Sequence, residues 1–205
     1  MPVADLPRRH SDAWLRATRH PFLVAVRDGT VPATAFVEWL VQDYRFVGDL
    51  LRFQARLLAR APRRAQPVLA GGALALVDEL AWFEGRAALG GLDLDAEALT
   101  ATAAYATLLQ RLDSADVPVA LVGLWALERS YLDAWSYVSP GAPPYREFVE
   151  HWTTPQFAAY VGGLEAAADA VVATAGAASD VEVVFAEVVE AESRFWDMAW
   201  PGRAP

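Results

Sequence analysis

Cysteine is absent from this chain of 205 residues. Disulfide bonds, thiolate metal sites and cysteine nucleophiles are therefore excluded, and cysteine usage says nothing about the redox compartment. Long apolar runs are absent as well. Although 55% of the residues are hydrophobic, each run is interrupted by Arg, Asp or Glu well before the roughly 20 residues that a bilayer-spanning helix needs. We expect no membrane span.

A secretory signal is not visible either, because the first residues, MPVADLPRRHSDAW, lack an apolar core and a small-residue cleavage site. We therefore expect a cytoplasmic protein. Positive charge is scarce: 17 basic residues stand against 26 acidic ones, which gives a net charge of −9 and a pI near 4.8. This balance argues against nucleic acid as a partner and favours a small molecule or another protein.

Apolar residues are spaced as in α-helices over almost the whole chain, and strand-like alternation never persists. Turn-forming segments interrupt the pattern at 27–36, 60–67, 89–99, 113–118, 139–144 and 153–157. We predict an all-α fold of about seven or eight helices in a single domain, residues 1–205. Thr30 is a candidate N-cap for the helix that follows it, and the Ala-rich segment 164–179 is expected to end in a loop.

Three predicted helices each place one acidic residue on the apolar stripe that should face the core. Asp43 lies on the stripe of helix 36–54, Glu128 at the centre of helix 119–135, and Glu192 on the last helix. A single such acid is explained by a buried ion pair, a bond to a neighbouring helix end, or a small rotation of the helix towards solvent. Three acids among aromatic residues also fit a ligand pocket, where burial brings some carboxyl pKa values towards neutrality.

Other candidate residues carry weaker signals. Tyr105, Tyr131 and Trp152 could form the walls around a flat ring, although aromatic residues on helix stripes also fit an ordinary core. Glu79 belongs to the segment DELAWFEG at 78–85, whose three acids cannot all lie on one stripe, so at least one of them should face solvent.

Metal and cofactor motifs are missing. None of the three histidines, His10, His20 and His151, has a Glu three residues before it, as a di-iron bundle would require. A lone histidine on a helix is a weak indication of a haem ligand. Walker A, G-x-S-x-G and G-x-G-x-x-G motifs are absent. We therefore expect neither a metal nor a cofactor.

The segment HPFLVAVRDGTVPATAFVEWLVQDYRFV at 20–47 resembles the N-terminal signature of the TenA family, which includes thiaminase II. The resemblance continues in family order and spacing through 78–85, 103–109, 124–135, 151–161 and 190–200. It implies a haem-oxygenase-like all-α fold, assembly into homo-oligomers, and an active site buried in each bundle. It also implies hydrolytic C–N cleavage on thiamin-related pyrimidines, used to salvage the pyrimidine half of degraded thiamin.

The segment LWALERSYLDAW at 124–135 resembles the cysteine-free branch of that family, in which a glutamate appears in this helix. That branch is associated with formylaminopyrimidine and aminopyrimidine substrates. The resemblance implies that Asp43 binds the aminopyrimidine edge as a carboxylate and that Glu192 is the C-terminal catalytic glutamate. Glu128 matches the acid specific to the branch.

The same resemblance assigns three aromatic side chains. Tyr105 matches a tyrosine that contacts the ring, and Trp152 stands where the cysteine branch carries a tyrosine. Phe46 also replaces a tyrosine of the cysteine branch, so a hydroxyl contact to the substrate is lost and the identity of the pyrimidine stays open.

The sequence thus predicts a cofactor-independent hydrolase of aminopyrimidines in which Glu128 and Glu192 divide the proton transfers in an order left open. One alternative is a pyrimidine-binding or regulatory protein without turnover, although no helix-turn-helix with a basic face is visible. Another is a relative with haem or pyrroloquinoline quinone chemistry, whose pocket is usually rich in His and Arg. Only three histidines are present, which argues against it.

Overall fold

The computed structural model describes residues 2–175 and 178–200, and over this part of the chain it contains α-helices, one short 3-10 helix and no strand. The α-helices with eight or more residues are α2 Ser11–Thr18, α3 Pro21–Asp28, α4 Ala33–Arg60, α5 Gln66–Gly90, α6 Thr100–Ser114, α7 Val117–Val138, α9 Pro155–Ala175 and α10 Ala178–Met198. The shorter helices are η1 Val3–Asp5, α1 Leu6–Arg9 and α8 Arg146–Trp152. The predicted all-α class is confirmed, and the predicted number matches the eight longer helices.

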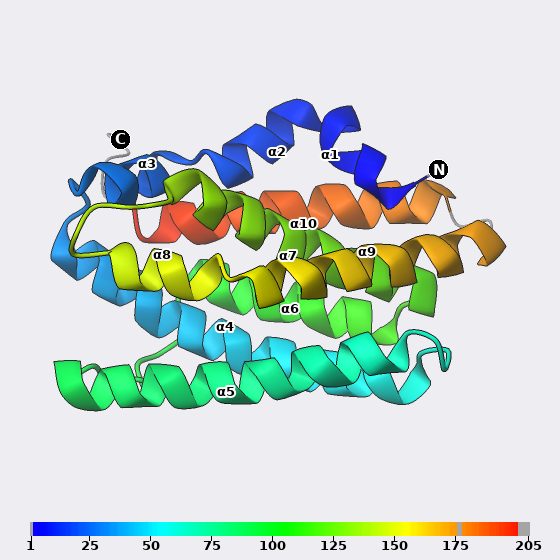
Figure 1. Ribbon diagram of the computed structural model, residues 1–205, viewed down its shortest axis with the longest axis horizontal. Helices are drawn as coiled ribbons and strands as arrows, with labels where there is room; N and C mark the ends of the chain where they lie inside the picture. Colours follow the sequence, from blue (N-terminus) through cyan, green and yellow to red (C-terminus); the bar gives the residue numbers. More distant parts are fainter. Residues whose placement is uncertain (1, 176–177, 201–205) are drawn as a thin grey trace.

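Helix α7 is the centre of the bundle, because it packs against α2, α3, α4, α6, α8, α9 and α10. Residues 120–128 of α7 are all buried, which explains a sequence that is apolar on every side apart from Glu128. Helices α4 and α5 pack along each other, and α5 lies at one edge of the molecule (Figure 1). No described helix is both long and apolar enough to cross a membrane.

The predicted N-cap role of Thr30 is wrong. Helix α3 ends at Asp28 and is capped by Gly29, whose φ of 74° is left-handed. This geometry turns the Thr30 backbone N–H onto the Ala25 carbonyl at 2.8 Å. Thr30 therefore closes α3, while α4 begins at Ala33 with Pro32 at its N-cap position. A glycine turn and a helix start lie so close together here that the sequence pattern assigned Thr30 to the wrong helix.

The loop predicted at the end of 164–179 falls partly on residues that lie outside the described part of the chain. Helix α9 continues to Ala175 and α10 begins at Ala178, and residues 176–177 lie outside the described part. Alanine has the highest helix propensity of all residues, so an Ala-rich segment without a clear apolar stripe can still be helical.

Candidate active site

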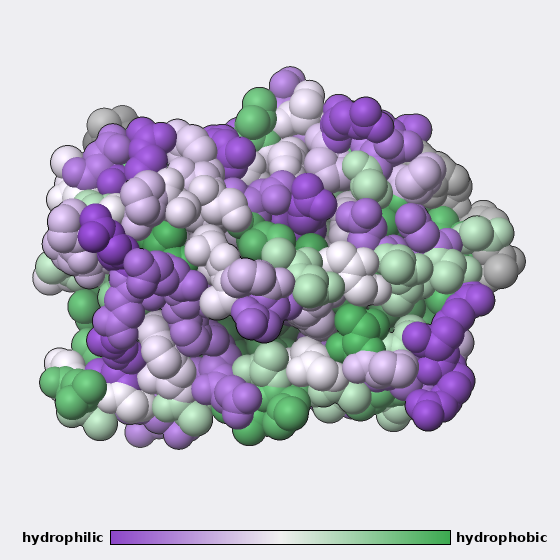
Figure 2. Space-filling view, viewed as in Figure 1, coloured by the Kyte–Doolittle hydropathy of each residue, from purple (hydrophilic) through white to green (hydrophobic). Residues whose placement is uncertain are grey.

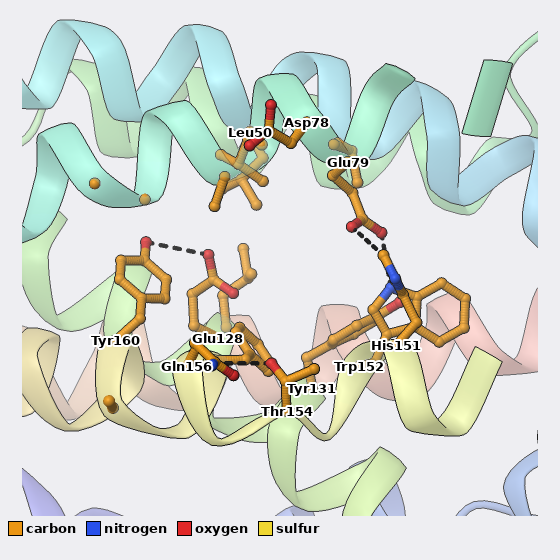
Figure 3. Close-up of a pocket in the computed structure, with 18 of the residues that line it drawn as sticks. Leu50, Asp78, Glu79, Glu128, Tyr131, His151, Trp152, Thr154, Gln156 and Tyr160 are labelled. Carbon is orange, nitrogen blue, oxygen red and sulfur yellow. Dashed lines mark hydrogen bonds and ion pairs between the residues drawn. The ribbon is translucent and has the colours of Figure 1, made fainter. Parts of the chain in front are cut away.

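A cavity of about 690 Å³ lies between α4, α5, α7, α8 and α9 (Figure 3). Most of its walls are apolar, and its few polar groups include four carboxyls that come from three helices: Asp43, Asp78, Glu79 and Glu128. An apolar cavity with a small number of convergent polar groups is the usual form of a small-molecule site.

Asp43 on α4 is 1% exposed, and the Tyr131 hydroxyl donates a hydrogen bond of 2.9 Å to its Oδ2. Burial raises the pKa of Asp43 well above its ordinary value, and the nearby charges of Glu79 and Glu192 raise it further. The Tyr131 bond opposes this effect. The ionised Asp43 expected from the sequence is therefore disfavoured in the ligand-free protein, and N–H donors from a ligand would be required to stabilise the carboxylate.

Glu128 on α7 also lines the cavity and is 5% exposed. The Tyr160 hydroxyl lies 3.3 Å from Glu128 Oε1 (Figure 3). Burial raises the pKa of Glu128 to about 8, with smaller upward contributions from the charges of Glu192 and Glu79 and a downward one from Tyr160. Glu128 is therefore largely protonated at neutral pH.

Glu192 on α10 is buried at 4% exposure, and the Tyr105 hydroxyl on α6 donates a hydrogen bond to its Oε1. Burial raises the pKa of Glu192 to about 7, while the bonds from Tyr105 and Ser130 lower it. Neither Glu192 nor Tyr105 is among the residues that line the cavity. The Tyr105 ring packs against Phe46, with ring centroids 4.6 Å apart, so Phe46 separates it from the cavity.

Of the aromatic residues predicted to surround a ring, Phe46, Tyr131 and Trp152 line the cavity, whereas Tyr105 does not. Trp152 packs against Tyr131 at 5.7 Å and against Trp135 at 4.5 Å between ring centroids. Trp135 in turn contacts Trp39, so the wall is backed by further buried rings. This packing leaves Trp152 little freedom to move and gives the cavity one rigid flat side.

Glu79 on α5, a weak candidate in the sequence, points towards the cavity from the side opposite α8 (Figure 3). Its carboxylate accepts a 2.7 Å hydrogen bond from Trp152 Nε1 and lies 2.6 Å from His151 Nε2. His151 stacks on Trp82 with centroids 4.1 Å apart and planes 9° from parallel. Glu79 thus holds Trp152 and His151 in place at the wall.

Two polar residues at the site were missed in the sequence. Gln54 lies eleven residues after Asp43, which is three helical turns along the same face of α4, so extending the stripe would have found it. Tyr160 follows Phe157 by three residues on α9, and both line the cavity. His151 was considered only as a metal or haem ligand.

Among the described residues, no group of three or more acidic or histidine side chains is arranged to hold a metal ion.

A model of the TENA/THI-4/PQQC family matches residues 8–202. The chain belongs to this family. A protein of Glycine max described as a "Probable bifunctional TENA-E protein" is 31% identical over 206 residues, which cover 94% of this chain and 90% of that protein. The resemblance seen in the sequence is confirmed, and the absence of cysteine agrees with the cysteine-free branch of TenA proteins.

Solved structures agree with this assignment. The X-ray structure of a TenA homologue from Pyrococcus furiosus superposes with a TM-score of 0.92 at 30% identity, covering 98% of this chain and all of that one. A TenA homologue from P. horikoshii OT3 gives a TM-score of 0.88 at 22% identity and covers 98% of this chain and 100% of that chain, which supports the fold alone. The haem-oxygenase-like TenA fold is therefore established for this chain.

Proposed function

We propose that this TenA homologue is a hydrolase of aminopyrimidines that bear a removable amino or formylamino group. One observation carries the proposal: Asp43 and Glu128 line one aromatic-walled cavity, Glu192 lies buried behind its wall, and burial brings the pKa of both glutamates close to neutrality. Groups with such pKa values can both donate and accept protons at physiological pH. The product would serve the salvage of the pyrimidine half of thiamin, as the family resemblance implies.

Asp43 would bind the edge of the heterocycle. Its carboxyl has two oxygens, so it can meet a ring nitrogen and the neighbouring amino group together, with the shared proton on either partner. Tyr131 holds this carboxyl at 2.9 Å and thereby fixes the orientation of the ring. Phe46 and Trp152 would lie against its faces.

The two glutamates would divide the proton transfers of hydrolysis. For a formylamino group, the water oxygen bonds to the formyl carbon, the water proton passes to a carboxylate, and the C–N bond breaks as a carboxylic acid protonates the leaving nitrogen. The products are the amine and formate. For an aminomethyl group, the water oxygen bonds to the methylene carbon and the C–N bond breaks. The same two proton transfers release ammonia and leave an alcohol. General acid–base help of this kind is worth about 10²–10⁴-fold in rate.

A catalytic role for Glu192 requires its side chain to move. Because it lies behind the cavity wall, its carboxyl has to turn towards the cavity to meet a reacting water, and the Tyr105 hydroxyl would define the start of this movement. In the proposed reaction, the Glu192 carboxyl therefore reaches the substrate only during turnover.

The experiment is a substrate panel of aminomethyl- and formylaminomethyl-pyrimidines, with ammonia and formate release as readouts. Glu128→Gln and Glu192→Gln should each lower kcat by at least about 10²-fold. Glu190→Gln is the matched control on α10, because Glu190 is exposed and pairs with Arg194 at 2.9 Å. Full activity in both site variants would contradict the mechanism. Tight binding without release of ammonia or formate would favour the alternative of a pyrimidine-binding protein.

A further inference from the structure

Gln54 is a fully buried polar residue on α4, with 0% exposure. Its Nε2 donates a 2.9 Å hydrogen bond to the Leu69 carbonyl of α5. Because a carbonyl can only accept, this bond fixes which end of the amide is nitrogen and turns Oε1 the other way. Gln54 Oε1 therefore faces the Tyr160 hydroxyl of α9, which donates to it at 3.0 Å.

Tyr160 has one hydroxyl proton and two acceptors nearby. Gln54 Oε1 lies 3.0 Å from its oxygen, and Glu128 Oε1 lies 3.3 Å from it, a contact drawn in Figure 3. While the proton is directed at Gln54, the Tyr160 oxygen presents a lone pair to Glu128. A lone pair is satisfied by a protonated carboxyl, which can donate to it, and is repelled by a carboxylate.

Gly72 provides the space for this arrangement. A Cβ atom at position 72 would lie 2.3 Å from Gln54 Nε2 and 2.4 Å from the Tyr160 ring. Any larger residue would separate Tyr160 from Gln54. Three helices, α4, α5 and α9, thus contribute to one hydrogen-bonded chain that ends at Glu128.

We propose that Gln54 is a positioning residue that draws the Tyr160 hydroxyl proton away from Glu128, so that Glu128 stays protonated and is the proton donor of the reaction, with Glu192 as the base. This assignment rests on the proposed hydrolase function. In the hydrolytic step, Glu192 takes the proton that water loses as its oxygen bonds to carbon. Glu128 delivers its proton to the nitrogen as the C–N bond breaks.

The surroundings of the two glutamates agree with this division. The Tyr105 hydroxyl donates to Glu192, and Tyr105 and Ser130 both lower the pKa of Glu192, which favours the carboxylate. The titratable groups that face Glu128 are Glu192 from α10, Glu79 from α5, Tyr160 from α9, Tyr105 from α6 and Asp43 from α4. Glu192 and Glu79 raise the pKa of Glu128. Both are unchanged in the variants that test the hydrogen-bonded chain from Gln54 through Tyr160 to Glu128, which we call the relay.

The test is an NMR titration of the ligand-free protein labelled with ¹³C at glutamate Cδ, in which the Glu128 signal is identified by its loss in Glu128→Gln. Tyr160→Phe removes the hydroxyl that can stabilise the carboxylate, so the midpoint should rise by about one pH unit. Gln54→Leu frees the same hydroxyl to donate to Glu128, so the midpoint should fall by a similar amount. Gln54→Met provides a second variant of closer length in case the leucine does not fold.

Two controls separate the relay from general disturbance. The double variant Gln54→Leu/Tyr160→Phe should have the same Glu128 midpoint as Tyr160→Phe alone, because no hydroxyl remains to be redirected. Tyr145→Phe removes another buried hydroxyl bond, to the Val31 carbonyl at 3.2 Å, outside the cavity, and should leave the Glu128 midpoint unchanged. Shifts in the same direction, or no shift, in folded Gln54 and Tyr160 variants would overturn the relay.

Activity gives the second readout. If Glu128 is the acid, the high-pH limb of kcat/KM should move up in Tyr160→Phe and down in the Gln54 variants, in step with the titration. A limb that does not follow the titration would overturn the assignment of Glu128 as the donor. If the Gln54 and Tyr160 variants shift the Glu128 midpoint in opposite directions but the protein turns over no aminopyrimidine, the proposed hydrolase function is overturned and only the hydrogen-bond relay is supported.

Discussion

Asp43, Glu128 and Glu192 are buried carboxyls whose charges interact, and each of them meets different hydrogen-bond partners. All three are buried, which raises each pKa. Tyr105 donates fully to Glu192, while the hydroxyl near Glu128 is shared with Gln54. The residue type alone therefore does not determine the role; the donor that each carboxyl meets does.

The pH dependence of the reaction follows from these values. Below about pH 7 Glu192 takes up a proton and can no longer act as the base, and above about pH 8 Glu128 loses its proton and can no longer act as the acid. We expect a bell-shaped profile of kcat/KM with limbs near these values, which belong to the pair as a whole. Initial rates over the range from about pH 5 to 10 test this, and a flat profile would contradict it.

Stability should depend on pH with a definite sign. In the unfolded chain Glu128 titrates near 4.5, whereas in the folded protein its pKa is about 8. Below the lower value the carboxyl is neutral in both states; as pH rises towards the higher one, only the unfolded chain ionises, so the free energy of unfolding falls. Glu128→Gln cannot ionise, so relative to wild type it should gain on the order of a few kcal/mol above about pH 8.

Urea unfolding at about pH 5 and at about pH 8.5 measures that difference. Glu190→Gln changes an exposed glutamate and should show no such pH-dependent gain. A gain of equal size at both pH values would show that the amide packs better for reasons unrelated to ionisation.

Asp43→Asn should weaken aminopyrimidine binding by roughly 10- to 100-fold, because one charge-assisted hydrogen bond is lost. Calorimetric titration of the folded variant gives the Kd. The control on the same helix is Asp49→Asn, since Asp49 pairs with Arg52 and does not line the cavity. Unchanged affinity in Asp43→Asn would contradict the ring-edge role.

At the scale of elements, α5 explains the largest gap between the sequence and the site. Only Leu69, Gly72, Phe83 and Ala87 of this helix are buried, yet apolar residues occur on its other faces as well. A helix that is apolar on several sides gives no stripe from which an inward face can be read. This is why Glu79 was a weak candidate, although its carboxylate holds the Trp152 indole at 2.7 Å.

Two adjacent glycines of α5 should respond oppositely to alanine. Gly72→Ala places a Cβ against Gln54 and Tyr160, so it should destabilise the fold by roughly 1–3 kcal/mol and disturb the site. At Gly71 a Cβ meets nothing within 4 Å, so Gly71→Ala should stabilise the helix by about 0.5–1 kcal/mol. Urea unfolding of both variants checks the pair, and effects of the same sign would contradict the packing described for Gly72.

At the scale of the whole molecule, the outer side of α5 exposes large apolar side chains to water. Leu74 is 64% exposed and Val77 49% exposed, and Figure 2 shows hydrophobic atoms along the edge where α5 lies. The family resemblance implies homo-oligomers, and we propose that a second copy packs on this face, because burying such residues is favourable.

The double variant Leu74→Glu/Val77→Glu should therefore lower the molar mass measured by light scattering after size exclusion. Leu15→Glu alters an exposed leucine on α2 and should leave the mass unchanged. A wild-type protein that is monomeric would contradict the proposed assembly, and an oligomer insensitive to the double variant would place its interface elsewhere.

The sequence by itself determined the helical class, a number of about seven or eight helices and the inward position of Asp43, Glu128 and Glu192, because helical periodicity is a local property that one chain segment reveals alone. It failed at Thr30, where a left-handed glycine ends the preceding helix and decides the boundary. Such boundaries depend on a few backbone angles that the apolar pattern does not report.

Only the tertiary structure decided which carboxyl meets which partner. The bonds from Tyr105 to Glu192, from Trp152 to Glu79 and from Tyr160 towards Glu128 join residues separated by 87, 73 and 32 positions, so no local spacing could predict them. The pKa values of the buried carboxyls depend on these contacts and on burial together. The sequence placed three acids inside the bundle, and helix packing gave each of them different chemistry.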